Sequence, residues 1–174
     1  MSTPTRELAE TLRTLASTPD ALCERLTRHE EILAVPDFDV LDAWALGTAV
    51  RDIAVRESLP IAISIVFGTQ RVFHAALPGA SANNDLWAAR KIAVVQLFNQ
   101  SSFLVGADAS RRGSSIYDRL SPADYADHGG AIPIRTRAGS LLGALAVSGL
   151  PSAHDHAVAV TALAKHLGVA LEEL

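Results

Sequence analysis

Two segments of alternating apolar residues, each doubling back after a short turn, constrain the fold of this chain more than any other feature. Residues 61–67 and 71–77 form the first segment, and residues 131–137 and 141–148 form the second. Alternation interrupted by a short turn is typical of an antiparallel β-hairpin. Residues 61–67 are mostly apolar at both sets of alternating positions, which predicts a strand covered on both faces.

Apolar residues at helical spacing predict that helices fill most of the remaining chain. The expected helices cover residues 5–17, 19–33, 39–57, 83–98 and 152–174, with short ones near residues 110–119 and 121–124. Capping is expected from Asp39 with Asp42, from Asn83 or Asn84, and from Ser152 with Asp155. Two hairpins separated by helices predict an α+β fold, with helices packed on one antiparallel sheet, and exclude a parallel βαβ array.

Length, charge and cysteine content limit the kind of protein. The 174 residues suit one domain, and a net charge of −4 (15 Lys and Arg against 19 Asp and Glu) argues against a nucleic-acid partner. The first residues carry charges where a signal peptide has its apolar run, and no apolar stretch reaches the roughly 18 residues of a membrane-spanning helix. We therefore expect a cytoplasmic protein without membrane segments. Its one cysteine, Cys23, lies near Asp20 and Glu24, which disfavour a thiolate, so an inert thiol is expected.

Candidate chemistry has to come from individual polar residues, because no Gly-rich phosphate loop, cysteine pair, HExxH or GxSxG motif is present. Residues 124–130, directly before the third strand, form the richest polar run. Gly129 and Gly130 allow a close backbone approach there and leave amides for a ligand. His128 is a candidate metal or haem-iron ligand or an acid–base group, and the alternative is a loop histidine that caps the strand entrance. The turn at residues 148–152 leads into a helix N-terminus that can accept an anion, although a plain turn is the simpler interpretation.

A second polar cluster occupies the start of the helix at residues 83–98. Arg90 and Lys91 follow Asp85 within two helical turns, where basic side chains gain nothing from the helix dipole. They are therefore candidates for binding an anion such as a carboxylate or a phosphate. The alternative is that they pair with Asp85, with Asp127 or with a loop carbonyl.

The other histidines are expected to have mainly structural roles. His74 lies within a strand, which favours a half-buried, hydrogen-bonded residue over a ligand. His154 and His156 flank a helix start and, two residues apart, face different directions, so both are expected at the surface. His29 and His166 lie along helices and are interpreted as surface or satisfied core residues.

An ordered set of motifs extends from about residue 24 to residue 171. It comprises Glu30-Glu31-Ile32-Leu33, Leu59-Pro60-Ile61-Ala62-Ile63, His74, Leu77-Pro78-Gly79, Asn84-Asp85, Trp87, Arg90-Lys91, His128-Gly129-Gly130-Ala131-Ile132-Pro133-Ile134, Gly143, Val147-Ser148-Gly149-Leu150-Pro151 and Asp155-His156. This set resembles the uncharacterised protein family of the haem-degrading, HbpS/GlcG-like superfamily, which includes the C-terminal domain of PduO-type corrinoid adenosyltransferases. The resemblance implies a profilin/PAS-like α+β domain at residues 23–174, a helical extension at residues 1–22, and assembly into a homo-oligomer.

The resemblance also implies haem binding or degradation and a set of ligand-binding residues. These residues are His74, Asn84, Asp85, Trp87, Arg90, Lys91 and His128, with Gly129 and Gly130 beside them. His128 and His74 are the candidate haem-iron ligands, and no other metal site is expected.

Three functional hypotheses follow. The first is a small-molecule-binding domain for haem or a small anionic metabolite. The second is a non-catalytic oligomeric interaction protein, and the third is an enzyme that uses His128 as an acid–base group on a small anionic metabolite. If the chain dimerises through the helix that carries Trp87, a partner is expected to cover Ile92 and Val95.

Overall fold

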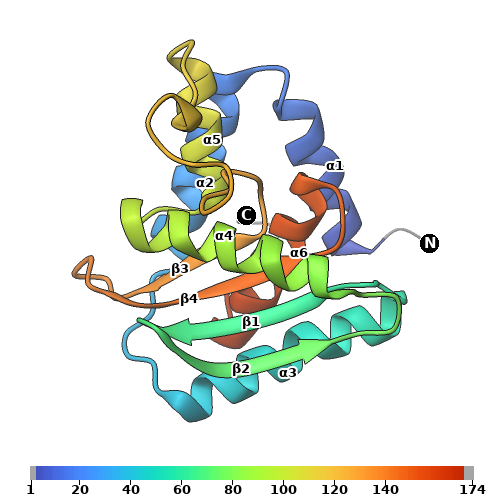
Figure 1. Cartoon of the computed structure of the whole chain (residues 1–174). Coiled ribbons are helices and arrows are strands. Elements are labelled where there is room, and N and C mark those ends of the chain that lie inside the picture. Colours follow the sequence, from blue (N-terminus) through green and yellow to red (C-terminus); the bar gives the residue numbers. More distant parts are fainter. Residues whose placement is uncertain (1–2, 171–174) are drawn as a thin grey trace.

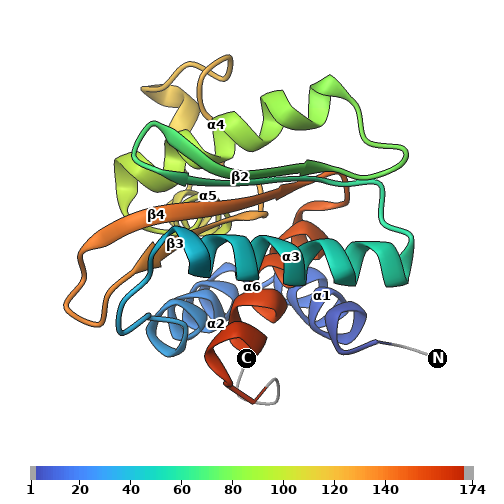
Figure 2. The ribbon, with the colours of Figure 1, turned by 90° about the horizontal axis from the view of Figure 1, so that it is seen from below.

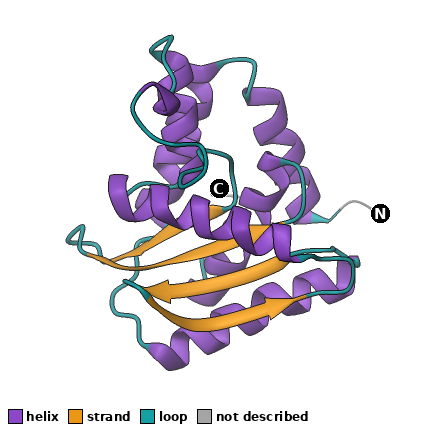
Figure 3. Cartoon of the chain, viewed as in Figure 1, coloured by secondary structure: helices purple, strands orange, loops and turns teal. Residues whose placement is uncertain are grey.

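Both hairpins predicted from the alternating residues are present, and they join in one sheet (Figure 3). The computed structural model describes residues 3–170. Strand β1 (Ala62–Phe67) pairs with β2 (Gln70–Ala76), and β3 (Ala131–Arg135) pairs with β4 (Leu141–Ser148). Strand β1 also pairs with β4, so the order is β2-β1-β4-β3 with every neighbouring pair antiparallel.

Helices account for most of the other described residues (Figure 1). They are α1 (Pro4–Leu15), α2 (Pro19–Ile32), α3 (Val40–Glu57), α4 (Ala82–Phe98), α5 (Ser102–Arg111), α6 (Ser152–Leu167) and the 3-10 helix η1 (Ile116–Asp118). None of the described helices is both long and apolar enough to span a bilayer.

The helices cover both faces of the sheet, as the apolar sequence of β1 predicts. Figure 2 shows α4 on one face and α3 with α6 on the other. Ile63 and Ile65 are fully buried on the side of α3 and α6, and each contributes about 1.5–3 kcal/mol through burial. On the opposite face Val66 packs beneath α4 against Ile92 and Val95. The expectation that a partner covers Ile92 and Val95 is therefore wrong, because the sheet of the same chain already buries both.

The segment between α4 and β3 is more helical than the sequence analysis expects. Helix α5 occupies Ser102–Arg111, and η1 lies within residues 110–119, where a short helix is expected, whereas residues 121–124 form a turn and no helix. The Ser101 side chain caps α5 by accepting from the Leu104 amide. Helix α5 continues through Gly106, where a β-carbon would collide with the carbonyl of Asp127. This glycine allows a loop to approach closely.

Two of the three predicted caps are wrong. The box of Asp39 and Asp42 at the start of α3 is confirmed. Helix α4 is instead capped by Ser81, whose amide donates to the Asn84 side chain. Helix α6 follows Pro151 without any side-chain cap, because the carboxylate of Asp155 has other partners, described below.

The two ends of the chain also differ from the predicted helix bounds. Helix α6 ends at Leu167, since Gly168 adopts a left-handed φ of 68° and stops the helix that was expected to reach residue 174. Residues 171–174 lie outside the described part. At the other end, α1 packs on α6, and Leu12 is fully buried in a cluster with Leu22 and Leu26 of α2. The boundary between an extension at residues 1–22 and a domain at residues 23–174 stays a prediction.

Candidate functional site

A pocket of about 210 Å³ lies where the first turns of α4 and α6 meet the end of β4. Helix α4 supplies two asparagines, a tryptophan and a lysine, and the remaining wall comes from the loop before β3, the turn after β4 and the start of α6. The lining residues are Asn83, Asn84, Trp87, Lys91, His128, Ser148, Gly149, Leu150, Ser152 and Asp155. Four of the residues assigned to a ligand site, Asn84, Trp87, Lys91 and His128, are therefore brought together.

A buried ion pair forms part of the pocket wall. The Nζ atom of Lys91 lies 2.8 Å from Oδ2 of Asp155, and both side chains are almost inaccessible, at 4% and 2% exposure. Lys91 also donates to the carbonyl of Val147 at 3.2 Å. The carboxylate of Asp155 accepts the amides of Gly149 and Leu150, at 3.3 and 3.0 Å. The pair thus ties α4 to both the end of β4 and the start of α6.

Burial shifts the protonation of both members of the pair. It raises the pKa of Asp155 to about 6, although Lys91 and the two amides oppose the shift. It also lowers the pKa of Lys91, against the attraction of Asp155. A carboxyl group that titrates this close to neutrality can hold or release a proton at the pocket wall.

His128 lies at the mouth of the pocket, with its side chain 51% exposed. Its ring stands edge-on to Trp87 at a centroid distance of 5.1 Å. The guanidinium of Arg90 lies over the ring of Trp87, 4.0 Å from the centroid, and donates to the carbonyl of Pro122 at 3.1 Å. Arg90 therefore donates to a loop carbonyl, as the alternative to anion binding predicts. It does not line the pocket. His128 keeps a free approach from solvent.

Gly129 and Gly130 position the loop rather than bind a ligand through free amides. The amide of Gly129 donates to Oγ of Ser152 at 2.6 Å, so the expectation of a free amide is wrong at this residue. Gly130 has a φ of 127°, and a β-carbon there would lie 2.7 Å from Nζ of Lys91 and would collide with the carbonyl of Val147. Only glycine leaves room here for the lysine of the ion pair.

His74 and Asp85 form a pair of their own that does not line the pocket. The Nε2 atom of His74 lies 2.7 Å from Oδ1 of Asp85, and each side chain is about one-third exposed. This contact joins the edge strand β2 to the first turn of α4. It confirms the interpretation of His74 as a half-buried, hydrogen-bonded strand residue.

The expectation that His154 and His156 are exposed is wrong. The side chain of His156 is 1% exposed and stacks on His29, with ring centroids 5.8 Å apart, while Phe103 lies edge-on to it. Burial drives the pKa of His156 well below its ordinary value. His154 is partly buried, and burial lowers its pKa as well. Helix α6 is covered by α1 and by the sheet, so its histidines face protein rather than water.

Two interpretations of residues outside the pocket agree with the structure. Burial raises the pKa of the Cys23 thiol, and Asp108 adds to the shift, so a thiolate is disfavoured. His166 is 19% exposed and stands edge-on to Phe38, with Nε2 3.8 Å from the carboxylate of Asp42. It is a packed residue with a polar partner.

Six lining residues are not among those that the sequence assigns to a ligand site. The sequence predicts a capping box for Ser152 and Asp155, a turn for Ser148, Gly149 and Leu150, and only a possible cap for Asn83. Their sequence signal was the turn at residues 148–152, which leads into a helix N-terminus. What the sequence does not reveal is that Lys91, 64 positions earlier than Asp155, closes on the same turn.

Comparison with known proteins identifies the family. Residues 38–164 match the family model described as "Haem degrading protein HbpS-like". The chain belongs to this family. It is 42% identical to a UPF0303 protein of Streptomyces avermitilis over 152 residues, which cover 86% of this chain and 93% of the relative. A UPF0303 protein of Zymomonas mobilis is 39% identical over 88% of this chain and 84% of the relative. The resemblance inferred from the motifs is confirmed.

Solved structures share the fold. The Ybr137w protein matches with a TM-score of 0.77 and 28% identity, over 84% of this chain and 87% of its own. A PduOC:Heme complex matches with a TM-score of 0.64 and 23% identity, over 73% of this chain and 93% of its own. HbpS matches with a TM-score of 0.61 and 18% identity, over 77% of this chain and 92% of its own. The α+β fold with helices on an antiparallel sheet, expected of this HbpS-like chain, is thereby confirmed.

Proposed function

We propose that this chain is a binding module for a small metabolite that carries a carboxylate or a comparable anionic group. The ligand occupies the pocket between α4 and α6. The observation that carries the proposal is that two helix N-termini converge on a pocket already lined by Lys91 and His128.

Helix N-termini supply the positive field of this pocket. Asn83 and Asn84 belong to the first turn of α4, and Ser152 is the first residue of α6. Each helix end acts as roughly half a positive charge and presents backbone N–H groups, which favours bound anions. Asp155 balances the charge of Lys91, and the carboxylate of Asp127 lies 3.6 Å from Nδ1 of His128, so the excess positive potential comes from the helices.

The size of the pocket selects for a small ligand. Pockets for drug-sized molecules have volumes of about 300–1,000 Å³. The volume here is about 210 Å³, which suits a compact metabolite and does not enclose a tetrapyrrole. The polar lining, with its asparagines and serines, suits a ligand with several hydrogen-bonding oxygens.

Haem lying across the mouth of the pocket is a second candidate ligand. Two observations favour it: a solved relative is a PduOC:Heme complex, and the half-exposed imidazole of His128 beside Trp87 could reach an iron from outside. The alternative iron ligand His74 is engaged by Asp85 and lies off the pocket. When bound, haem would supply iron-centred redox chemistry, while His128 would hold it in place.

Tryptophan fluorescence offers a direct test, because Trp87 lines the pocket and the other tryptophan, Trp44, is on the far side in α3. In a Trp44→Phe background, we expect oxalate, pyruvate or succinate to change the Trp87 emission saturably, and neutral acetamide to leave it unchanged. His128→Ala should weaken the binding of the acid about tenfold, the cost of one charge-assisted hydrogen bond. His74→Ala is the matched control and should bind normally.

The outcomes separate the candidates. If none of the three acids perturbs Trp87, or if His74→Ala weakens binding as much as His128→Ala, the proposal of an anion pocket is wrong. Haemin is titrated in parallel and followed by absorbance. A Soret shift that saturates at one haem per chain and is lost in His128→Ala would support haem at the mouth instead.

We also propose self-association through the outer face of α4. This face exposes Leu86 and Leu97, at 63% and 53%, on the side of the helix away from the buried Ile92 and Val95. Exposed apolar side chains on one face of a helix favour contact with a partner. A monomer by light scattering would contradict this proposal. A cytoplasmic location stays a prediction.

A further inference from the structure

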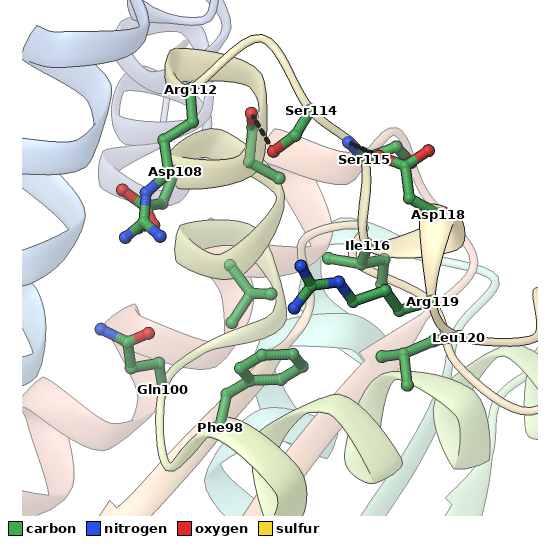
Figure 4. A pocket seen from close by; sticks show the side chains of 12 residues that line it. Phe98, Gln100, Asp108, Arg112, Ser114, Ser115, Ile116, Asp118, Arg119 and Leu120 are labelled. Atoms are coloured by element: carbon green, nitrogen blue, oxygen red, sulfur yellow. Dashed lines mark hydrogen bonds and ion pairs between the residues drawn. The ribbon is translucent and has the colours of Figure 1, made fainter.

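A larger cavity, of about 510 Å³, lies at the opposite end of α4 (Figure 4). Its wall is formed by the C-terminal end of α4, one side of α5 and the segment that contains η1. No residue of this wall lines the pocket between α4 and α6. The volume lies within the range of about 300–1,000 Å³ that is usual for small-molecule sites.

One part of the wall is apolar. It consists of Phe98, Val105, Ile116 and Leu120. Phe98 is 40% exposed, although burial of a phenylalanine side chain contributes about 1.5–3 kcal/mol. Figure 4 shows this ring facing the cavity. The wall therefore offers an apolar surface for a ligand.

Arg119 is a cation without a partner at this apolar wall. Its guanidinium extends into the cavity between Phe98 and Ile116 (Figure 4), and it makes no hydrogen bond or ion pair with any residue in the range 3–170. The other charged groups at the wall are occupied. Arg112 pairs with Asp108, which also binds Arg111 from outside the wall, and the carboxylate of Asp118 accepts the amide of Ser115.

The segment that carries Arg119 is held in place by its own hydrogen bonds. The amides of Arg119 and Leu120 donate to the carbonyl of Ile116 at 3.1 and 3.0 Å. The hydroxyl of Ser114 donates to the carbonyl of Ala109 at 3.2 Å, which fixes the segment to the end of α5. A cavity formed in advance reduces the entropy that a ligand loses on binding.

We propose that this cavity is a second ligand site, for an amphipathic monocarboxylate with an aliphatic or aromatic body. The body packs on Phe98 and Ile116, and the carboxylate receives the fork of N–H donors of Arg119. A planar guanidinium matches a carboxylate in a bidentate geometry. The site is independent of the proposed function, because the two ligands share no residue.

Matched probes of equal chain length test the charge requirement. Calorimetric titrations of the whole protein use octanoate, octanol and octylammonium. We expect octanoate to bind about tenfold or more tightly than the other two. Arg119→Gln should remove this preference, because it removes the charge and keeps a polar side chain. Arg137→Gln, at an exposed arginine on the β3–β4 turn, is the matched control and should bind octanoate normally.

A second variant tests the cavity itself. Gln100 is an exposed residue of the wall, so Gln100→Trp should fill the cavity and abolish octanoate binding without disturbing the core. Equal affinities for the three probes, or octanoate binding that survives both Arg119→Gln and Gln100→Trp, would overturn the proposal. His128→Ala should leave octanoate binding unchanged. Failure at this site and failure at the α4–α6 pocket are therefore distinguishable.

Discussion

The two ends of α4 carry two pockets of opposite design. At the N-terminal end the pocket is small and polar, and its lysine is already paired with Asp155. At the C-terminal end the cavity is more than twice as large, has an apolar wall, and its Arg119 has no partner among the described residues. The first end thus combines binding groups with the contacts that hold three elements together, whereas the second adds a ligand surface outside the core. Substitutions at the first end should therefore cost more stability than substitutions at the second.

Removal of one partner of the buried pair should have the largest effect. Asp155→Ala leaves Lys91 as a buried, unpaired charge and also removes the acceptor of two amides. We expect a loss of about 3–5 kcal/mol in the free energy of unfolding, measured by urea denaturation. Arg119→Gln, at the other end, should change it by less than about 0.5 kcal/mol. Similar losses in the two variants would contradict the contrast between the pockets.

The double variant Lys91→Met with Asp155→Leu sharpens this test. Replacement of both charges by apolar groups removes the unpaired charge, so we expect it to recover most of the stability lost in Asp155→Ala. A double variant as unstable as the single one would show that the amide contacts of Asp155, rather than the charge of Lys91, dominate the cost.

Glycine substitutions make the same comparison at the level of the backbone. Gly130→Ala places a methyl group against the carbonyl of Val147 and forces alanine to adopt a φ of 127°. Gly113→Ala, near the second cavity, has a φ of 64° and open space around the new methyl group. We expect a loss of about 1 kcal/mol for Gly113→Ala, from conformation alone, and a loss at least twice as large for Gly130→Ala. Equal changes in thermal denaturation would indicate that the loop at Gly130 moves away.

The sequence predicts the sheet better than it predicts the pockets, for a physical reason. The alternation in residues 61–67 reflects burial on both faces, and it is encoded locally, so β1 and its turn are predicted within one residue. The ion pair joins Lys91 to Asp155 across the fold, and no local pattern encodes that contact. Asp155 follows Ser152 by three residues, so the local sequence predicts a capping box and not the ion pair.

The helix α5 shows how a local rule can mislead. Gly106 and the serines around it are typical of a loop, yet they lie in a helix. Glycine is required at this position because Asp127 packs closely against it. His156 misleads in the same way, since a polar residue at a helix start is usually exposed, whereas here α1 and the sheet cover the helix. Both errors come from tertiary packing that overrides local preference.

The last predicted effect is a gradual pH dependence that comes from His156 of α6, which packs against His29 of α2 and Phe103 of α5. His156 follows Asp155 on α6, and the desolvation of the ring, then His29 and Lys91, disfavour its protonation and lower its pKa. Because its pKa is lowered in the folded protein, the unfolded chain takes up a proton below about pH 6.5 that the folded protein does not. The raised pKa of Asp155 has the opposite sign, since the folded protein takes up a proton between about pH 6 and 4. In the wild-type protein the two contributions to the pH dependence of the free energy of unfolding therefore partly cancel.

A difference measurement isolates the histidine. The free energy of unfolding of the wild-type protein minus that of His156→Leu should fall by about 1.4 kcal/mol for each pH unit below 6.5, because only the wild-type unfolded chain takes up this proton. The contribution of Asp155 is common to both proteins and cancels. A pH-independent difference for His156→Leu would mean that the folded protein already protonates His156, and the lowered pKa that we assign to this buried ring would be wrong.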